Sequence, residues 1–109
     1  MLKVIFEQKG NNLTLRLEGH AGQADIGHDI VCASASILAY TVAQFVKEAE
    51  ENGYLKSSAE INLESGDSVI SCKPTDEMLI DMQNIYIFAE KGYHLLAHNY
   101  PQFVELKPF

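Results

Sequence analysis

The residues of this chain that could do chemistry together are one histidine and one cysteine in a single short stretch, His20 and Cys32. A cysteine attacks as its thiolate, which needs a positive environment and a base close by. Cys32 falls in the first turn of a predicted helix, where the helix dipole favours negative charge. His20 ends a predicted strand, within reach of Cys32 if strand and helix pack side by side. We therefore predict a Cys-His nucleophilic site.

Two further residues have candidate supporting roles in this site. Asp29 has the chemistry of a helix N-cap, although its carboxylate could instead orient His20. Ser36 lies one turn beyond Cys32 on the same helix face. Its hydroxyl has two candidate partners, the thiol or a substrate on one side and a carbonyl of its own helix on the other. The sequence leaves both pairs of alternatives open.

The segment between the histidine and the helix is a candidate substrate loop, because Gly22 and Gly27 make its backbone easy to move. A loop of this kind can order over a bound peptide. The amides that open the following helix, that of Cys32 included, are candidate donors to an oxyanion. The expected site therefore consists of a nucleophile, a base and a mobile loop beside them.

Composition restricts the classes of function. The chain has 109 residues and is expected to form a single domain over 1–109, with a net charge of −7 that argues against direct nucleic-acid binding. The first residues show no apolar run of signal-peptide length, so a cytoplasmic location with free thiols at Cys32 and Cys72 is expected. The spacing of these cysteines fits no zinc site, and no glycine motif for phosphate binding appears, so no metal or cofactor is predicted.

The elements that must position the pair follow from apolar periodicity and turn residues. Alternation predicts strands, and spacing of three and four predicts helices. The second helix should start with a capping hydroxyl and two acids, contains Gly92, and precedes an edge strand. The expected elements are strands at 2–8, 13–19, 57–64, 68–73 and 102–107, and helices at about 30–52 and 75–98. This ββαββα(β) order predicts a small two-layer α+β domain, with an antiparallel or mixed sheet packed with two main helices.

The first predicted helix is apolar on nearly all sides. Its segment 30–46 contains several hydroxyl and amide side chains and is too short and too polar for a membrane span. We therefore expect a buried helix and no membrane partner. A sheet on one side leaves part of this surface uncovered, so a second helix or a second subunit should cover the rest.

The stretch Gly19-His20-Ala21, followed by Gly27-x-Asp29-Ile30-Val31-Cys32-Ala33-x-x-Ser36, resembles the signature of the ribosomal-processing cysteine protease family, Prp. The chain length and element order are similar as well. The resemblance implies a cytosolic, homodimeric endopeptidase with a Cys-His dyad at Cys32 and His20. It also implies a peptide substrate, the N-terminal extension of a large-subunit ribosomal protein, removed after an aromatic residue. Asp29 and Ser36 match supporting positions of the motif.

Two other classes of function remain compatible with these residues. One is a non-catalytic module that binds a peptide or the ribosome in the same groove. The other is a thiol redox or acyl-transfer protein, although no resolving cysteine accompanies Cys32. His94 and His98 stand at i and i+4 on the second predicted helix, a spacing that can bind metal. No third ligand is evident beside them, which favours a solvated or packed pair.

Overall fold

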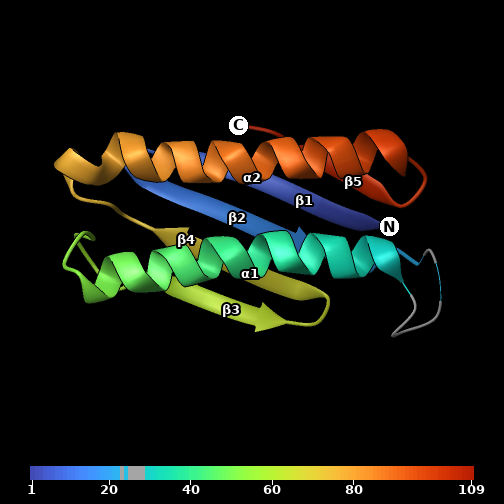
Figure 1. The fold of residues 1–109 in the computed structure, drawn as a ribbon, viewed down its shortest axis with the longest axis horizontal. Helices are drawn as coiled ribbons and strands as arrows, with labels where there is room; N and C mark the ends of the chain where they lie inside the picture. The colour runs from blue at the N-terminus through green and yellow to red at the C-terminus, as the bar shows by residue number, and fades with distance from the viewer. Residues whose placement is uncertain (23, 25–28) are drawn as a thin grey trace.

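The computed structural model describes residues 1–22, 24 and 29–109. Within this part of the chain, five strands form one sheet and two long helices lie side by side across one of its faces (Figure 1). In chain order the elements are β1 (Leu2–Lys9), β2 (Asn12–Glu18), α1 (Ile30–Glu51), β3 (Glu60–Glu64), β4 (Asp67–Cys72), the short 3-10 helix η1 (Asp76–Met78), α2 (Leu79–Asn99) and β5 (Val104–Lys107). The predicted α+β class with two layers is confirmed.

The strands are arranged in the order β3-β4-β2-β1-β5. The sheet is mixed, because β5 runs parallel to β1 while the other neighbours are antiparallel. β5 is an edge strand as predicted. The alternation in β2 works as the sequence indicated, since Leu13, Leu15 and Leu17 are buried on the side that the helices cover. β3 is shorter than predicted and begins at Glu60.

Small residues let α1 lie close to its neighbours. Its buried positions are valines and alanines at helical spacing: Val31, Ala35, Ala39, Val42, Ala43, Val46 and Ala49. By length and composition alone this helix of 22 residues could cross a membrane, contrary to the expectation from its sequence. Since one complete face is packed in the core of the domain, its apolar composition is explained as that of a core helix.

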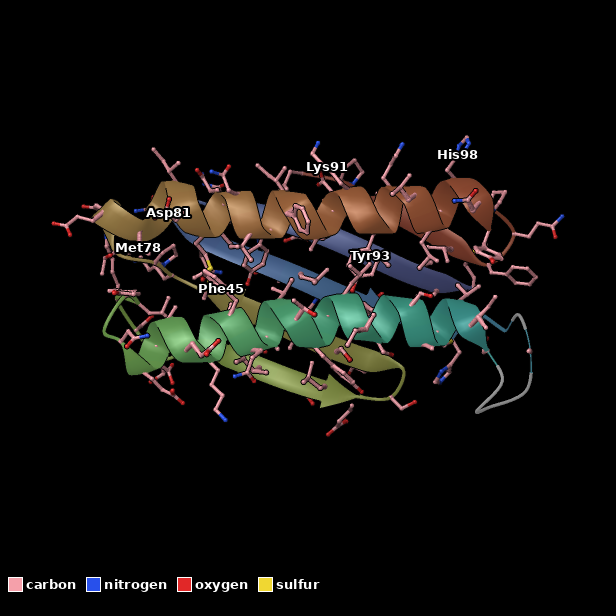
Figure 2. All side chains as sticks on the ribbon, in the orientation of Figure 1. Phe45, Met78, Asp81, Lys91, Tyr93 and His98 are labelled. Carbon is pink, nitrogen blue, oxygen red and sulfur yellow. The ribbon has the colours of Figure 1, made fainter. Side chains whose placement is uncertain are left out.

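The two helices meet at Gly92, which does not interrupt α2. A Cβ at Gly92 would lie 2.9 Å from both terminal methyl carbons of Leu38 on α1, so the glycine permits close helix packing. Tyr93 points from α2 toward α1 (Figure 2), where its buried hydroxyl donates to the carbonyl of Ala35 at 2.8 Å. Its ring also packs against the ring of Phe6 on β1 in a T-shaped arrangement, with the centroids 5.8 Å apart. This contact therefore joins α1, α2 and the sheet.

The start of α2 differs from the prediction. The residues after Pro74 form η1, and α2 begins at Leu79. Thr75 precedes this 3-10 turn, but its hydroxyl accepts no capping hydrogen bond. The predicted capping role of this hydroxyl was therefore wrong, although the chain does turn into a helix at this point.

Candidate active site

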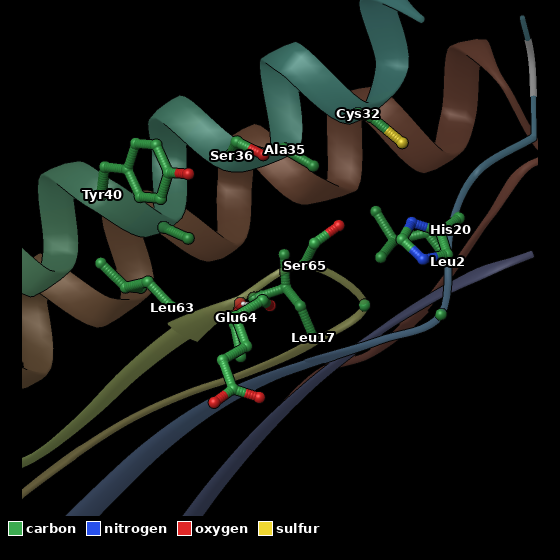
Figure 3. A pocket seen from close by; sticks show the side chains of 14 residues that line it. Leu2, Leu17, His20, Cys32, Ala35, Ser36, Tyr40, Leu63, Glu64 and Ser65 are labelled. Carbon is green, nitrogen blue, oxygen red and sulfur yellow. Dashed lines mark hydrogen bonds between the residues drawn. The ribbon is translucent and has the colours of Figure 1, made fainter. Parts of the chain in front are cut away.

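A cavity of about 200 Å³ brings the predicted pair together, between α1, the end of β2 and the β3–β4 turn. Cys32 points into it from the first turns of α1, and His20 faces it from the segment that follows β2 (Figure 3). The lining comprises Leu2, Leu17, Gly19, His20, Cys32, Ala35, Ser36, Ala39, Tyr40, Leu63, Glu64, Ser65, Gly66 and Ser68. Histidine and cysteine thus occupy two walls of one cavity, as the spacing argument required.

Asp29 caps the helix that carries the cysteine. Its Oδ1 accepts from the amides of Val31 at 3.0 Å and Cys32 at 2.9 Å, and the side chain is buried. The N-cap alternative is thereby confirmed, and the cap fixes the backbone of Cys32. The Asp29 carbonyl also accepts from the amide of Ala33. These three amides thus already have acceptors at the helix start, and a role of the Cys32 amide towards an oxyanion stays a prediction.

The cap also changes the electrostatics around the sulfur. A carboxylate at the helix N-terminus offsets the positive end of the dipole, which would otherwise favour a thiolate. No lysine or arginine is among the described residues that line the cavity, and Glu64 adds a further carboxylate. His20 is therefore the side chain of this lining that can carry positive charge. In the described part of the chain no hydrogen bond joins His20 to Cys32, a looseness common in substrate-free sites.

Ser36 faces the cavity one helical turn from Cys32 (Figure 3). Other α1 hydroxyls bond back to their own helix: Ser34 donates to the carbonyl of Ile30 and Thr41 to that of Ile37. Ser36 makes no such bond within the described residues. Of the two alternatives for this hydroxyl, the structure favours the one directed at the thiol or a substrate.

The candidate substrate loop is described only in part. Gly22 has φ +71°, and a Cβ there would meet open space. Gly27 lies outside the described residues, as does His28, so the loop prediction is not tested. One wall of the cavity was missed from the sequence: the β3–β4 turn, where Ser65 and Gly66 line the site. The residues Ser65-Gly66-Asp67 indicated a turn, and no periodicity showed that it meets His20.

The remaining candidates lie apart from this cavity. His94 and His98 line a shallow groove between α2 and β5, and His98 projects to the outer side of α2 (Figure 2). Across the described residues, no three His, Cys, Asp or Glu side chains are grouped to hold a metal ion. Cys72 is buried on β4 beside the Tyr86 hydroxyl, and burial raises the pKa of its thiol. Cys72 is therefore a core residue.

Comparison with known proteins gives a family and a shared fold. The sequence model of the family described as Cysteine protease Prp matches residues 1–105. No match was found among curated protein sequences. The fold is similar to a ribosomal processing protease Prp from Staphylococcus aureus in complex with a covalently linked product peptide, with a TM-score of 0.73, 20% identity and complete coverage of both chains.

Two further solved structures share the fold. The same S. aureus protease in complex with a substrate peptide gives a TM-score of 0.69 at 19% identity, again over both complete chains. A Streptococcus mutans protein gives a TM-score of 0.70 at 25% identity, covering all of this chain and 94% of the other. The family match extends over nearly the whole chain and includes every residue that lines the cavity. This chain belongs to the Prp family of cysteine proteases and is a cysteine peptidase.

Proposed function

We propose that Cys32 is the nucleophile of this peptidase and that His20 is its general base and then its general acid. The supporting observation is the single cavity that both side chains line from separate elements. Because the Asp29 cap offsets the helix dipole, the positive partner of the thiolate is the His20 imidazolium. Ser36 and Asp29 support the pair, Ser36 by offering its hydroxyl and Asp29 by fixing the first turn of α1.

The steps of hydrolysis follow from these positions. The Cys32 thiolate attacks the peptide carbonyl carbon, and a tetrahedral oxyanion forms. When the C–N bond breaks, the His20 imidazolium gives its proton to the leaving amine, and a thioester remains on Cys32. His20 then takes a proton from water as the water attacks the thioester, and the C–S bond breaks to release the carboxylic acid and the Cys32 thiolate, which restores the thiolate–imidazolium pair. The Ser36 hydroxyl is the proposed donor to the oxyanion, because the neighbouring amides are engaged by Asp29.

We further propose that the substrate is the N-terminal extension of a large-subunit ribosomal protein, cleaved after an aromatic residue. The lining of the cavity offers apolar surface for such a side chain, from Leu17, Ala39, Tyr40 and Leu63. The S. aureus structures hold a substrate peptide and a product peptide on the same fold. A ribosomal substrate would place this peptidase in the cytoplasm, the compartment that we propose for it.

The test uses purified protein and a ribosomal protein that carries its N-terminal extension, with cleavage followed by mass spectrometry. Cys32→Ala and His20→Ala should each reduce kcat/KM by about 10⁴-fold or more while the thermal unfolding transition is retained. Cys72→Ala is the matched control, because it removes the other thiol from the core and should keep full activity. Normal cleavage by Cys32→Ala would refute the proposal.

The same experiment separates the other two classes of function. A non-catalytic peptide- or ribosome-binding module would bind the extension without turnover, and Cys32→Ala would bind equally well. A redox or acyl-transfer protein would show oxidised or acylated Cys32 in mass spectra without peptide hydrolysis. The family match favours hydrolysis over both.

We also propose that the active form is a homodimer. The solvent side of the two helices exposes large apolar side chains, at Ile37, Tyr40, Ile80, Phe88 and Leu95, and Phe88 is 76% exposed. Surfaces of this kind on a small domain are typical of interfaces. Light scattering should give twice the chain mass of 12.1 kDa at micromolar concentration. A monomeric mass at the concentration that supports full activity would contradict this proposal.

A further inference from the structure

We propose that Gly66, in the turn between β3 and β4, is a positioning residue that holds the His20 ring at its place in the cavity wall. The inference rests on the proposed function, in which His20 is the base. Gly66 lies far from the Cys-His motif in the sequence, yet it lines the same cavity. Its contribution is the space that a missing side chain leaves for the imidazole.

The contact between the glycine and the ring is close. A Cβ at Gly66 would lie 2.8 Å from His20 Nε2, 3.2 Å from Cε1 and 3.6 Å from Cδ2. The outer edge of the imidazole therefore rests against the turn, on the surface where any other residue would place a side chain. His20 is exposed and no described group hydrogen-bonds its ring, so the close approach of this turn is one of the constraints on where the ring can lie.

The backbone ties the turn to the base as well. The amide of Gly19, directly before His20, donates to the carbonyl of Gly66 at 2.9 Å. Gly19 has φ +84°, and a Cβ on it would lie 2.6 Å from the carbonyl oxygen of Met1. The segment that carries His20 is thus held between the N-terminal residue and the β3–β4 turn, so ring and turn keep a fixed relation.

A methyl group at Gly66 would act on activity more than on folding. The imidazole is the free end of a side chain and can rotate away about its χ angles without moving backbone. That rotation takes the nitrogen away from its place in the cavity, and a displacement of about 1 Å can lower a rate by roughly 100-fold. Gly66 also has φ +81°, so alanine adds backbone strain of its own.

Gly53 supplies the matched control for this strain. It has φ +76°, and a Cβ there would meet nothing within 4 Å. Gly53→Ala therefore reproduces the backbone strain without touching His20. Should Gly66→Ala fold poorly, Gly66→Asn carries the same Cβ and tolerates positive φ better.

The experiment is a double-mutant cycle in the Cys72→Ala background, with two readouts: the alkylation rate of Cys32 by iodoacetamide and the cleavage of the ribosomal extension. Gly66→Ala should lower the alkylation rate and kcat by about 10- to 100-fold with KM little changed. Gly53→Ala should match its loss of thermal stability and keep both rates. With His20→Ala already present, Gly66→Ala should cause no further fall in alkylation.

Three outcomes would overturn the inference. Gly66→Ala could match Gly53→Ala in both rates, which would mean that the ring needs no such space. Gly66→Ala could slow alkylation equally without His20, which would mean that the methyl acts on Cys32 directly. If His20→Ala alone leaves both rates unchanged, the proposed dyad fails as well, and this single variant identifies that case.

Discussion

The Asp29 cap supports a quantitative prediction, because one buried carboxylate holds the turn that presents Cys32. Asp29→Ala removes hydrogen bonds of 3.0 and 2.9 Å from two backbone amides and leaves those amides without their acceptor. N-cap replacements by alanine cost about 0.5–2 kcal/mol. The bonds here are charge-assisted and Asp29 is only 9% exposed, so we expect a loss of about 2 kcal/mol.

Urea unfolding measures this loss. With an m value of about 1–3 kcal/mol/M, the midpoint should fall by about 1 M. Asp29→Asn keeps an oxygen acceptor but removes the charge, so its loss should be only about 0.3–1 kcal/mol. In the folded variants, the alkylation rate of Cys32 should also change, because the first turn of α1 is no longer fixed.

Thr75 provides the control, since it precedes η1 without a side-chain capping bond. Thr75→Ala should change the free energy of unfolding by less than about 0.5 kcal/mol. The reasoning is refuted if Asp29→Ala unfolds within about 0.5 kcal/mol of the wild type, or if both alanine variants lose the same amount.

Two further predictions concern the core and the outer helix surface. Burial raises the pKa of the Cys72 thiol and of the Tyr93 hydroxyl. The stability gained by keeping each group neutral is complete below its pKa in the unfolded chain, about 8.5 for the thiol and about 10 for the hydroxyl, and is lost at higher pH, where the unfolded chain ionises first. The urea midpoint should therefore fall from pH 8 to 10.5, less steeply for Tyr93→Phe above pH 10, and a constant midpoint would contradict this. Phe88→Glu should convert the proposed dimer to monomer, whereas Ser57→Glu, an exposed loop control, should not; a dimeric Phe88→Glu would exclude that surface.

The sequence predicted the elements well where one signal dominated. The alternation of Leu13, Leu15 and Leu17 fixed the buried face of β2, and Asp29 marked the start of α1. The glycine at 92 was ambiguous, because sequence propensity counts it against a helix. Its role depends on Leu38 of the neighbouring helix, a tertiary contact that no local pattern contains.

The part of the site on α1 could be predicted from the sequence, because it depends on local spacing. The part on the β3–β4 turn could not, because it depends on the pairing of distant strands. Cys32, Asp29 and Ser36 belong to one helix, so their relation follows from helical spacing. The β3–β4 turn meets His20 only because β4 pairs with β2 in the sheet, and that pairing brings Gly66 to the end of β2. Register between distant strands cannot be read from a single hairpin signal.

The helix start and the His20 side of the site meet two different requirements of a thiolate, its position and its positive partner. The Asp29 cap fixes the position of Cys32, but its carboxylate accepts from the same amides that would otherwise stabilise a negative sulfur. Positive charge must then come from His20, whose ring rests on a turn outside the Cys-His motif. The reactivity of Cys32 should accordingly follow the placement of His20 more closely than the integrity of the helix start. A change in the β3–β4 turn should thus affect catalysis more than a change of equal stability cost at the start of α1.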